Sequence, residues 1–297
     1  MTLVYEAKAE DWARTPKNCN TNNHESDMSV DEYKRRISQT NKNVWVRSFP
    51  DPPGTITIPI SVARCKILSE ASKIGFITNA RSSLFKEELD EIESYINTFV
   101  PSDVIGRWFI RLNEASPKDG KYGVGPLLSA KEMVTSLVTS VRAHRSFETS
   151  IKMNVSDILY LVPWRQDWNE FLEFRVFVHE RKVTCLSQYV WCRNLGWNQN
   201  NITIVAPRIL DYCNTTVLSK FDLNSFVVDI IVVIKDPIIT DEKHIPLITK
   251  DIVFDIEVVE FNSFGSELAS GAALFHWLND HDVMYSDGTS VVVRYVE

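Results

Sequence analysis

Hydrophobic residues recur at helical spacing in two segments of the first half of the chain. From Ser83 to Phe99 they return every three or four residues with acids between them, which predicts an amphipathic helix. A second helix is expected to begin at Ser129, because Glu132 three residues later can complete a capping box. The buried stripe of this helix is predicted to be Val134, Leu137, Val138 and Val141. One more helix is expected in the second half, over 267–278.

Apolar runs of strand length make up much of the remainder. Strands are predicted at 44–46, 108–112, 158–162, 171–178, 183–189, 226–234 and 252–261. The two runs that flank 179–182 are typical of a hairpin, and a last hairpin is expected over 284–295. The polar, asparagine-rich stretch 14–31 is expected to be a loop or a poorly ordered segment. Because strands and helices are segregated rather than alternating, the pattern indicates an α+β fold.

The composition narrows the class of protein only slightly. Hydrophobic residues make up 44% of the 297 residues and charged residues 24%, which is typical of a globular protein with a core. No apolar run is long enough to span a bilayer, and the first ten residues lack the apolar core of a secretion signal. The five cysteines are scattered without a CxxC pair, so we expect reduced thiols in a cytoplasmic protein with no membrane partner. The net charge of −7 argues against non-specific coating of nucleic acid but leaves room for a local basic cleft.

The first residues that could carry chemistry lie at the end of the strand 108–112 and in the loop after it. Arg111 ends the strand, and Lys118 and Lys121 lie in the loop. The loop also contains three glycines, Gly120, Gly123 and Gly125. Glycines allow backbone amides to approach a polyphosphate closely, while Arg and Lys neutralise its charge. Taken alone, the group is more simply explained as a charged surface hairpin, and no Walker or Rossmann glycine motif is present.

Glu173 and Arg175 form a second candidate group. Being two residues apart, they share one face of a predicted central strand. Two interpretations stay open: a same-face ion pair on a solvated sheet, or the floor of a ligand cleft. The histidines suggest no catalytic arrangement with serine or cysteine, and we expect them to be structural.

The third group consists of acids inside apolar strands. Asp229 interrupts the run 226–234, and Glu260 and Asn262 share one face of the strand 252–261. Burying lone carboxylates is costly, so a cation or a basic partner is expected beside them, and Mg²⁺ suits such hard oxygen ligands. The alternative is that the acids lie at strand ends in contact with water. Two further acids on the second strand are rival ligands: Asp255 and Glu257.

Three motifs in this order resemble the cell-division-cycle protein 123 family of ATP-grasp proteins. The first is Arg-Leu-Asn-Glu-Ala-Ser-Pro-Lys-Asp at 111–119, and the second is Glu-Phe-Arg-Val-Phe-Val at 173–178, followed by Ser187-Gln188. The third is Val-Val-Asp-Ile at 227–230 with Glu-Phe-Asn-Ser-Phe-Gly at 260–265. The resemblance covers roughly 85–278. Arg111 stands where eukaryotic members usually have lysine, and Ser263 where they have proline.

The resemblance implies an ATP-grasp fold, in which two lobes with mixed or antiparallel sheets enclose a nucleotide site. Residues 1–100 would form an N-terminal region with a polar segment and a helix. Residues 101–160 would form the N-terminal lobe and residues 161–297 the C-terminal lobe.

The resemblance also implies ATP and Mg²⁺ as cofactors. The residues that would bind the nucleotide are Arg111, Ser116, Lys118, Asp119, Tyr160, Leu161, Val162, Glu173 and Arg175. Among them Lys118 and Arg175 are the candidates for a catalytic role at the phosphates. The magnesium ligands would be Asp229, Glu260 and Asn262.

The family resemblance further implies an ATP-dependent assembly factor, with a subunit of translation initiation factor 2 as partner. The pair Arg111 and Lys118 also resembles phage and viral ATP-grasp proteins proposed to repair RNA. A ligase that acts on RNA ends, or on a protein or peptide carboxylate, is therefore the alternative. A scaffold without enzymatic activity is a third possibility, and whether the chain is an enzyme stays open.

Overall fold

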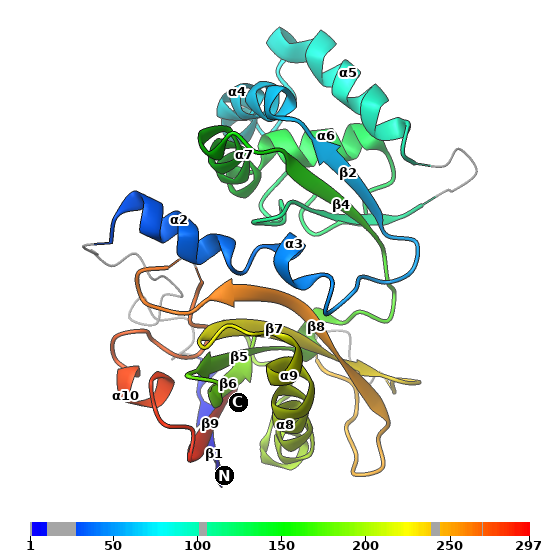
Figure 1. The fold of residues 1–297 in the computed structure, drawn as a ribbon. Coiled ribbons are helices and arrows are strands. Elements are labelled where there is room, and N and C mark those ends of the chain that lie inside the picture. The colour runs from blue at the N-terminus through cyan, green and yellow to red at the C-terminus, as the bar shows by residue number, and fades with distance from the viewer. Residues whose placement is uncertain (1, 11–27, 101–105, 239–243, 269) are drawn as a thin grey trace. The chain divides into compact units, whose positions relative to one another are not determined.

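The computed structural model describes residues 2–10, 28–100, 106–238, 244–268 and 270–297 (Figure 1). The chain forms two compact units: unit 1 is Met1–Phe49 with Gln166–Glu297, and unit 2 is Pro50–Arg165. The N-terminal segment thus belongs with the C-terminal half, whereas the sequence analysis set 1–100 apart as one region. Most of the predicted polar loop at 14–31 lies outside the described residues.

A three-stranded antiparallel sheet in the order β2-β4-β3 underlies unit 2. Its strands are β2 (Ile56–Ile60), β3 (Trp108–Arg111) and β4 (Asp157–Pro163). Its helices are α4 (Val62–Thr78), η2 (Ser83–Phe85), α5 (Lys86–Asn97), α6 (Ala130–Thr139) and α7 (Val141–Met153). Ser61, Ser129 and Ser140 cap α4, α6 and α7 by accepting backbone N–H hydrogen bonds. The apolar helix faces and the sheet share one buried core.

Unit 1 contains a six-stranded mixed sheet in the order β1-β9-β6-β5-β7-β8. Its strands are β1 (Thr2–Lys8), β5 (Glu173–His179), β6 (Lys182–Gln188), β7 (Phe226–Ile234), β8 (Phe254–Ser263) and β9 (Ser290–Val296). The pairs β1–β9 and β9–β6 are parallel, and the other pairs are antiparallel. Its helices are α2 (Val30–Ser38), α3 (Lys42–Trp45), η3 (Glu170–Leu172), α8 (Gln199–Tyr212), η4 (Cys213–Val217), α9 (Leu218–Lys220) and α10 (His281–Met284).

The two faces of this sheet differ in character. Phe174, Val176 and Val228 point to one face, where they join a large core with residues of α8. Phe177 and Val227, which are adjacent in sequence to Val176 and Val228, point to the other face and pack against the segment after β8. Polar residues of the predicted site share this second face.

Several predictions from the sequence are confirmed. The α+β class is correct, since unit 1 has a mixed sheet and unit 2 an antiparallel one. Helix α5, strands β3 and β4, and strands β7 and β8 lie where their patterns predicted them, within about two to three residues at most ends. The hairpin of β5 and β6 is also present, and it turns at Glu180 and Arg181 with φ values of 46° and 61°. Among the described residues, no helix is long and apolar enough to cross a membrane.

The strand predicted at 44–46 is wrong, because these residues end a short helix, α3, at Trp45. Trp45 and Phe49 are four residues apart, and both rings contact Phe261 of β8, at centroid distances of 5.6 and 5.3 Å. Helical spacing brings both rings to one side, where they cover the sheet. Val141 is also misassigned: it is exposed and begins α7, because Ser140 starts a new helix there.

The helix predicted over 267–278 is wrong as well, because the described residues of this segment are turns and loops. Ala273 has a φ of 50°, which an α-helix does not allow, and side chains from the sheet bind the segment's backbone. The last predicted hairpin, over 284–295, is also wrong. Its second half is β9, whose partners are the distant strands β1 and β6.

Candidate functional site

Six polar residues lie directly opposite one another across all six strands of unit 1. In sheet order this polar row is Glu6, Arg294, Ser187, Arg175, Asp229 and Glu260. Residues paired in register point to the same face of a sheet, so the row forms one transverse polar line. The second and third motifs, which contain Arg175 and Asp229, therefore meet on this line.

The centre of the row is a buried, bidentate ion pair. Arg175 donates from Nε and Nη2 to the two carboxylate oxygens of Asp229, at 2.8 and 2.7 Å. Its Nη1 donates to the carbonyl oxygen of Gly271 at 2.7 Å, and Asn262 Nδ2 donates to Asp229 at 3.1 Å. The side chains of Arg175 and Asp229 are only 6% and 0% exposed. Burial acts to lower the pKa of Arg175, but the charge of Asp229 outweighs it and keeps the guanidinium protonated.

Glu260 is the acid that lies beside Asp229. The two residues are direct cross-strand neighbours, and a β-bulge next to this pair places Glu257 opposite Ile231, further along β7. Asp255 is exposed and forms an ion pair with Lys235 at 3.2 Å. The structure therefore groups Glu260 and Asn262 with Asp229 and sets Asp255 and Glu257 apart from them. Glu173, at the start of β5, is buried.

In unit 2, Arg111 and Tyr160 are opposed residues of β3 and β4, and both are buried. Tyr160 donates its hydroxyl to Asn113 Oδ1 at 3.2 Å. Burial raises the pKa of Tyr160 to about 12, and the charge of Asp51 adds to the effect. The tyrosine is therefore a neutral hydrogen-bonding group at physiological pH.

Asp157, at the start of β4, holds the residues that follow Arg111. Its carboxylate accepts hydrogen bonds from the backbone of Asn113 at 3.2 Å, from Ile158 at 2.7 Å and from the Ser146 hydroxyl at 2.8 Å. Burial raises the pKa of Asp157, and these hydrogen bonds oppose that effect. Asp157 thus fixes the start of the loop that carries Ser116 and Lys118.

The loop's continuation is fixed by helix α7. The carboxylate of Asp119 accepts from the Ser140 hydroxyl and from the backbone N–H groups of Val141 and Arg142, at 3.0 and 3.3 Å for the latter two. Arg142 Nε donates to the Ser116 carbonyl at 2.9 Å. Asp119, predicted as a nucleotide ligand, therefore caps a helix here. The Ser116 hydroxyl is buried and has no hydrogen-bond partner among the described residues.

Residues 160–162 of β4, predicted to bind the nucleotide, differ in which groups a ligand could contact. The Leu161 side chain belongs to the core, so only its backbone can contact a ligand. The pairing of β2 with β4 ends at Leu161, one residue before Val162, while β3 still pairs with Val162. The backbone of Val162 is therefore not paired with β2, on the side of β4 where β2 lies.

The oxygen donors of Asp229, Glu260 and Asn262 fit Mg²⁺ by their chemistry, because Mg²⁺ prefers carboxylate and amide oxygens. Asp229 oxygens retain lone pairs beyond those used by Arg175. Within the described part of the chain, no group of three or more His, Cys, Asp or Glu residues could hold a metal ion. A magnesium site here would thus have two carboxylates at most, which is common for Mg²⁺ bound with phosphates.

Sequence reasoning missed the roles of Arg294 and Asp157. Arg294 interrupts the apolar run of β9 as Asp229 interrupts β7, so the same signal was present in the sequence. Asp157 stands immediately before an apolar run, where an exposed strand end is the simpler expectation.

The chain is a two-unit α+β protein whose fold is similar to that of Cdc123. The structure of Cdc123 from Schizosaccharomyces pombe matches with a TM-score of 0.60 and 19% identity, over 89% of this chain and 98% of that one. A C-terminally truncated form of the same protein matches over the same shares, with a TM-score of 0.58 and 19% identity. A RimK-domain ATP-grasp protein from Sphaerobacter thermophilus matches at a TM-score of only 0.33 and 12% identity, over 86% and 69% of the chains, and carries no weight. No curated protein matches the sequence significantly.

The model of the D123 family matches residues 72–297, about three quarters of the sequence. The chain belongs to the D123 family.

Proposed function

We propose that this protein binds ATP together with Mg²⁺ and uses it to assist assembly of a complex that contains translation initiation factor 2. Asp229, Glu260 and Asn262 would hold the metal. Arg111 and Lys118 would neutralise the phosphates. The backbone at Tyr160 to Val162 would meet the adenine.

One observation carries this proposal: in a D123-family chain, the acids Asp229 and Glu260 and the amide of Asn262 meet at the β8 end of the polar row. Arg175 supplies one positive charge beside these two carboxylates, so a further cation would be stabilised next to them. When bound, Mg²⁺ would supply the positive charge that the phosphate oxygens of ATP require. Arg175 would then serve by fixing the orientation of Asp229, since Asp229 and Gly271 occupy its guanidinium.

The experiment incubates the protein with labelled ATP and total cell protein, and separately with RNA. An assembly factor is expected to bind ATP by itself and to consume it only in the mixture with total cell protein, which contains the translation factor. A Glu260→Gln variant serves as the matched control, because it removes one charge at nearly constant shape. Equal behaviour of both proteins in every mixture would contradict the proposal.

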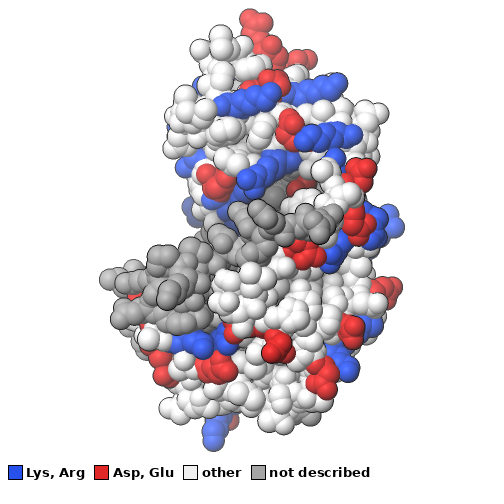
Figure 2. Space-filling model, turned by 90° about the vertical axis from the view of Figure 1, so that its left-hand side faces the viewer, with Lys and Arg blue, Asp and Glu red and all other residues white. Residues whose placement is uncertain are grey.

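The alternative, a ligase that acts on RNA ends, is favoured by the charge of unit 2. Figure 2 shows Lys and Arg side chains gathered on one face of this unit. The exposed basic residues of α4 and α7 are Lys66, Lys73, Arg142, Arg145 and Lys152. Such a surface suits a phosphate backbone, whose binding would weaken with salt. Transfer of label to RNA in the experiment above would favour this alternative, and transfer to a protein or peptide would favour a carboxylate ligase.

A further inference from the structure

The segment that follows the Glu260–Asn262 motif crosses over the polar row. We call residues 264–280 the strap, with residue 269 outside the described part. Three neighbouring members of the row hold its backbone. Arg175 donates to Gly271 O at 2.7 Å, and Arg294 donates to Leu274 O at 3.2 Å. Ser187, which lies between the two arginines in the row, accepts from Leu274 N at 3.4 Å.

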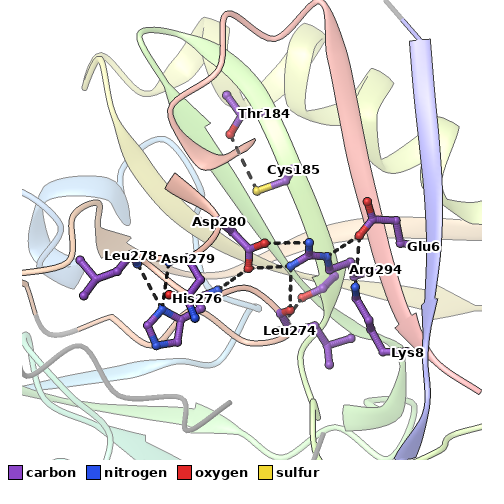
Figure 3. A network of polar contacts seen from close by, with 11 residues as sticks. Glu6, Lys8, Thr184, Cys185, Leu274, His276, Leu278, Asn279, Asp280 and Arg294 are labelled. Atoms are coloured by element: carbon purple, nitrogen blue, oxygen red, sulfur yellow. Dashed lines mark hydrogen bonds and ion pairs between the residues drawn. The ribbon is translucent and has the colours of Figure 1, made fainter. Parts of the chain in front are cut away.

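The strongest of these contacts centres on Arg294 (Figure 3). Its Nη1 and Nη2 donate to the two oxygens of Asp280 at 2.7 and 2.8 Å, and its Nε donates to Glu6 at 2.8 Å. Asp280 in turn accepts from the backbone N–H of His276 at 2.8 Å. The guanidinium also lies 4.3 Å from the ring centroid of Phe275. Arg294 therefore contacts three groups near the end of the strap: the Leu274 carbonyl, the Asp280 carboxylate and the Phe275 ring.

The strap depends on such side-chain contacts because its described residues form neither a helix nor a strand before α10. Ladder hydrogen bonds fix a strand, whereas a loop is fixed by whatever binds its polar backbone groups. Bidentate bonds from a buried arginine are strong and geometrically specific. Arg294 is thus well placed to set the strap's path over the sheet.

The position of the strap matters for Asp229 and Glu260, the acids at the β8 end of the row. Gly271 O takes the one guanidinium nitrogen of Arg175 that does not bind Asp229. If the strap shifts, Nη1 of a buried arginine loses its acceptor, and the arginine must move to recover one. Asp229 is bonded to the same guanidinium, so its orientation toward Asn262 would change too.

We propose that Arg294 is a positioning residue for the acid site. By holding Asp280 and Leu274 it fixes the strap, the strap presents Gly271 O to Arg175, and Arg175 orients Asp229. The step from Asp229 to magnesium rests on the proposed function. The steps from Arg294 to Gly271 do not.

The test compares Arg294→Met with Arg35→Met, a matched change at an exposed ion pair of α2. The first measurement is hydrogen exchange without ligand. Arg294→Met is expected to speed exchange at Leu274 and nearby strap amides, and Arg35→Met is expected to leave them unchanged. The second is the Mg²⁺ concentration required for ATP binding, which should rise about tenfold or more in Arg294→Met, as when the support of a metal ligand is removed. Asp280→Asn, a milder change, should reproduce both effects and replaces the methionine variant if that fails to fold.

Unchanged strap exchange in Arg294→Met and Asp280→Asn would overturn the positioning role. Faster exchange with an unchanged Mg²⁺ requirement would overturn the link from the strap to Asp229. If the unaltered protein binds no ATP, the proposed function fails, and the exchange result by itself then decides whether Arg294 fixes the strap.

Discussion

Asp229 shows how one buried charge constrains its neighbours. It sits within an apolar strand and is neutralised by Arg175 on the adjacent strand, while Glu260 lies on its other side. Removal of one member of a buried pair leaves an uncompensated charge. The bidentate ion pair with Arg175 belongs to Asp229, so the two acids are expected to contribute differently.

This difference predicts unequal effects of two similar substitutions. Asp229→Asn should lower the free energy of unfolding by about 3–5 kcal/mol, because the charge of Arg175 stays buried without its counter-ion. Glu260→Gln should change stability less and should mainly remove the Mg²⁺ dependence of ATP binding. Thermal and chemical unfolding of both variants, together with calorimetry, checks this. Equal loss of stability in the two variants would contradict the division of roles.

A second residue-level prediction concerns Lys118. Lys118→Ala should weaken ATP binding about tenfold or more, as expected when a charged hydrogen bond worth roughly 1.5–3 kcal/mol is lost. Lys131→Ala, at an exposed lysine of α6, is the matched control and should leave the affinity unchanged. If both variants bind ATP like the unaltered protein, Lys118 does not contact the phosphates.

At the scale of elements, strong local sequence patterns were sufficient to predict helices and strands, and weak patterns were not. The helix α5 and the strand β7 carry clear periodicity or a long apolar run, and both lie where predicted. The strap contains apolar residues at near-helical spacing, but its backbone is bound by Arg175 and Arg294 from distant strands. Strand β9 pairs with β1 from the other end of the chain. Local patterns do not show such long-range contacts.

The attachment of β1 is expected to depend on pH. Burial acts to raise the pKa of Glu6, but the hydrogen bond and charge of Arg294 outweigh it, and the pKa lies below its usual range. A carboxyl group whose pKa is lowered by folding stabilises the fold at pH values above its pKa in the unfolded chain, about 4.3. This stabilisation is lost as the pH falls through the pKa of the folded state. The protection of β1 amides, measured relative to their intrinsic exchange rate at each pH, should therefore fall as pH drops below the unfolded value, and Glu6→Gln should weaken that dependence. The same pH response in the variant would show that another group controls β1.

The loop at Lys118 is expected to require a glycine at 120. A Cβ at Gly120 would lie 2.5 Å from the Ser136 carbonyl oxygen of α6, so the loop must move away from the helix. Gly120→Ala should cost about 1–3 kcal/mol of stability, as overpacking does, and should weaken ATP binding. At Gly123, with a φ of 61°, an added Cβ meets no atom within 4 Å, so Gly123→Ala should cost only the left-handed backbone, about 1–2 kcal/mol. Unfolding and ATP titration of both variants test this, and normal ATP binding in Gly120→Ala would show that the loop tolerates displacement.

At the scale of the whole molecule, each unit has its own core and carries its own group of candidate site residues. The motifs at 111–119, 173–178, 227–230 and 260–265 drew attention to these residues, because they are charged within apolar strands or a glycine-containing loop, and the family resemblance supplied their expected roles. The supports of these groups were not predicted. Asp157, Asp119 and Arg294 act through contacts with residues distant in the sequence, and only the folded chain brings these together.

The most direct test of the account is calorimetry of ATP binding with Mg²⁺ and with EDTA. Without the metal, Asp229 and Glu260 should repel the triphosphate at close range, so affinity should fall strongly in EDTA. Glu260→Gln should bind with less dependence on Mg²⁺ than the unaltered protein. Equal affinity of the unaltered protein in Mg²⁺ and in EDTA, or no binding of ATP in either, would contradict the assignment of this site.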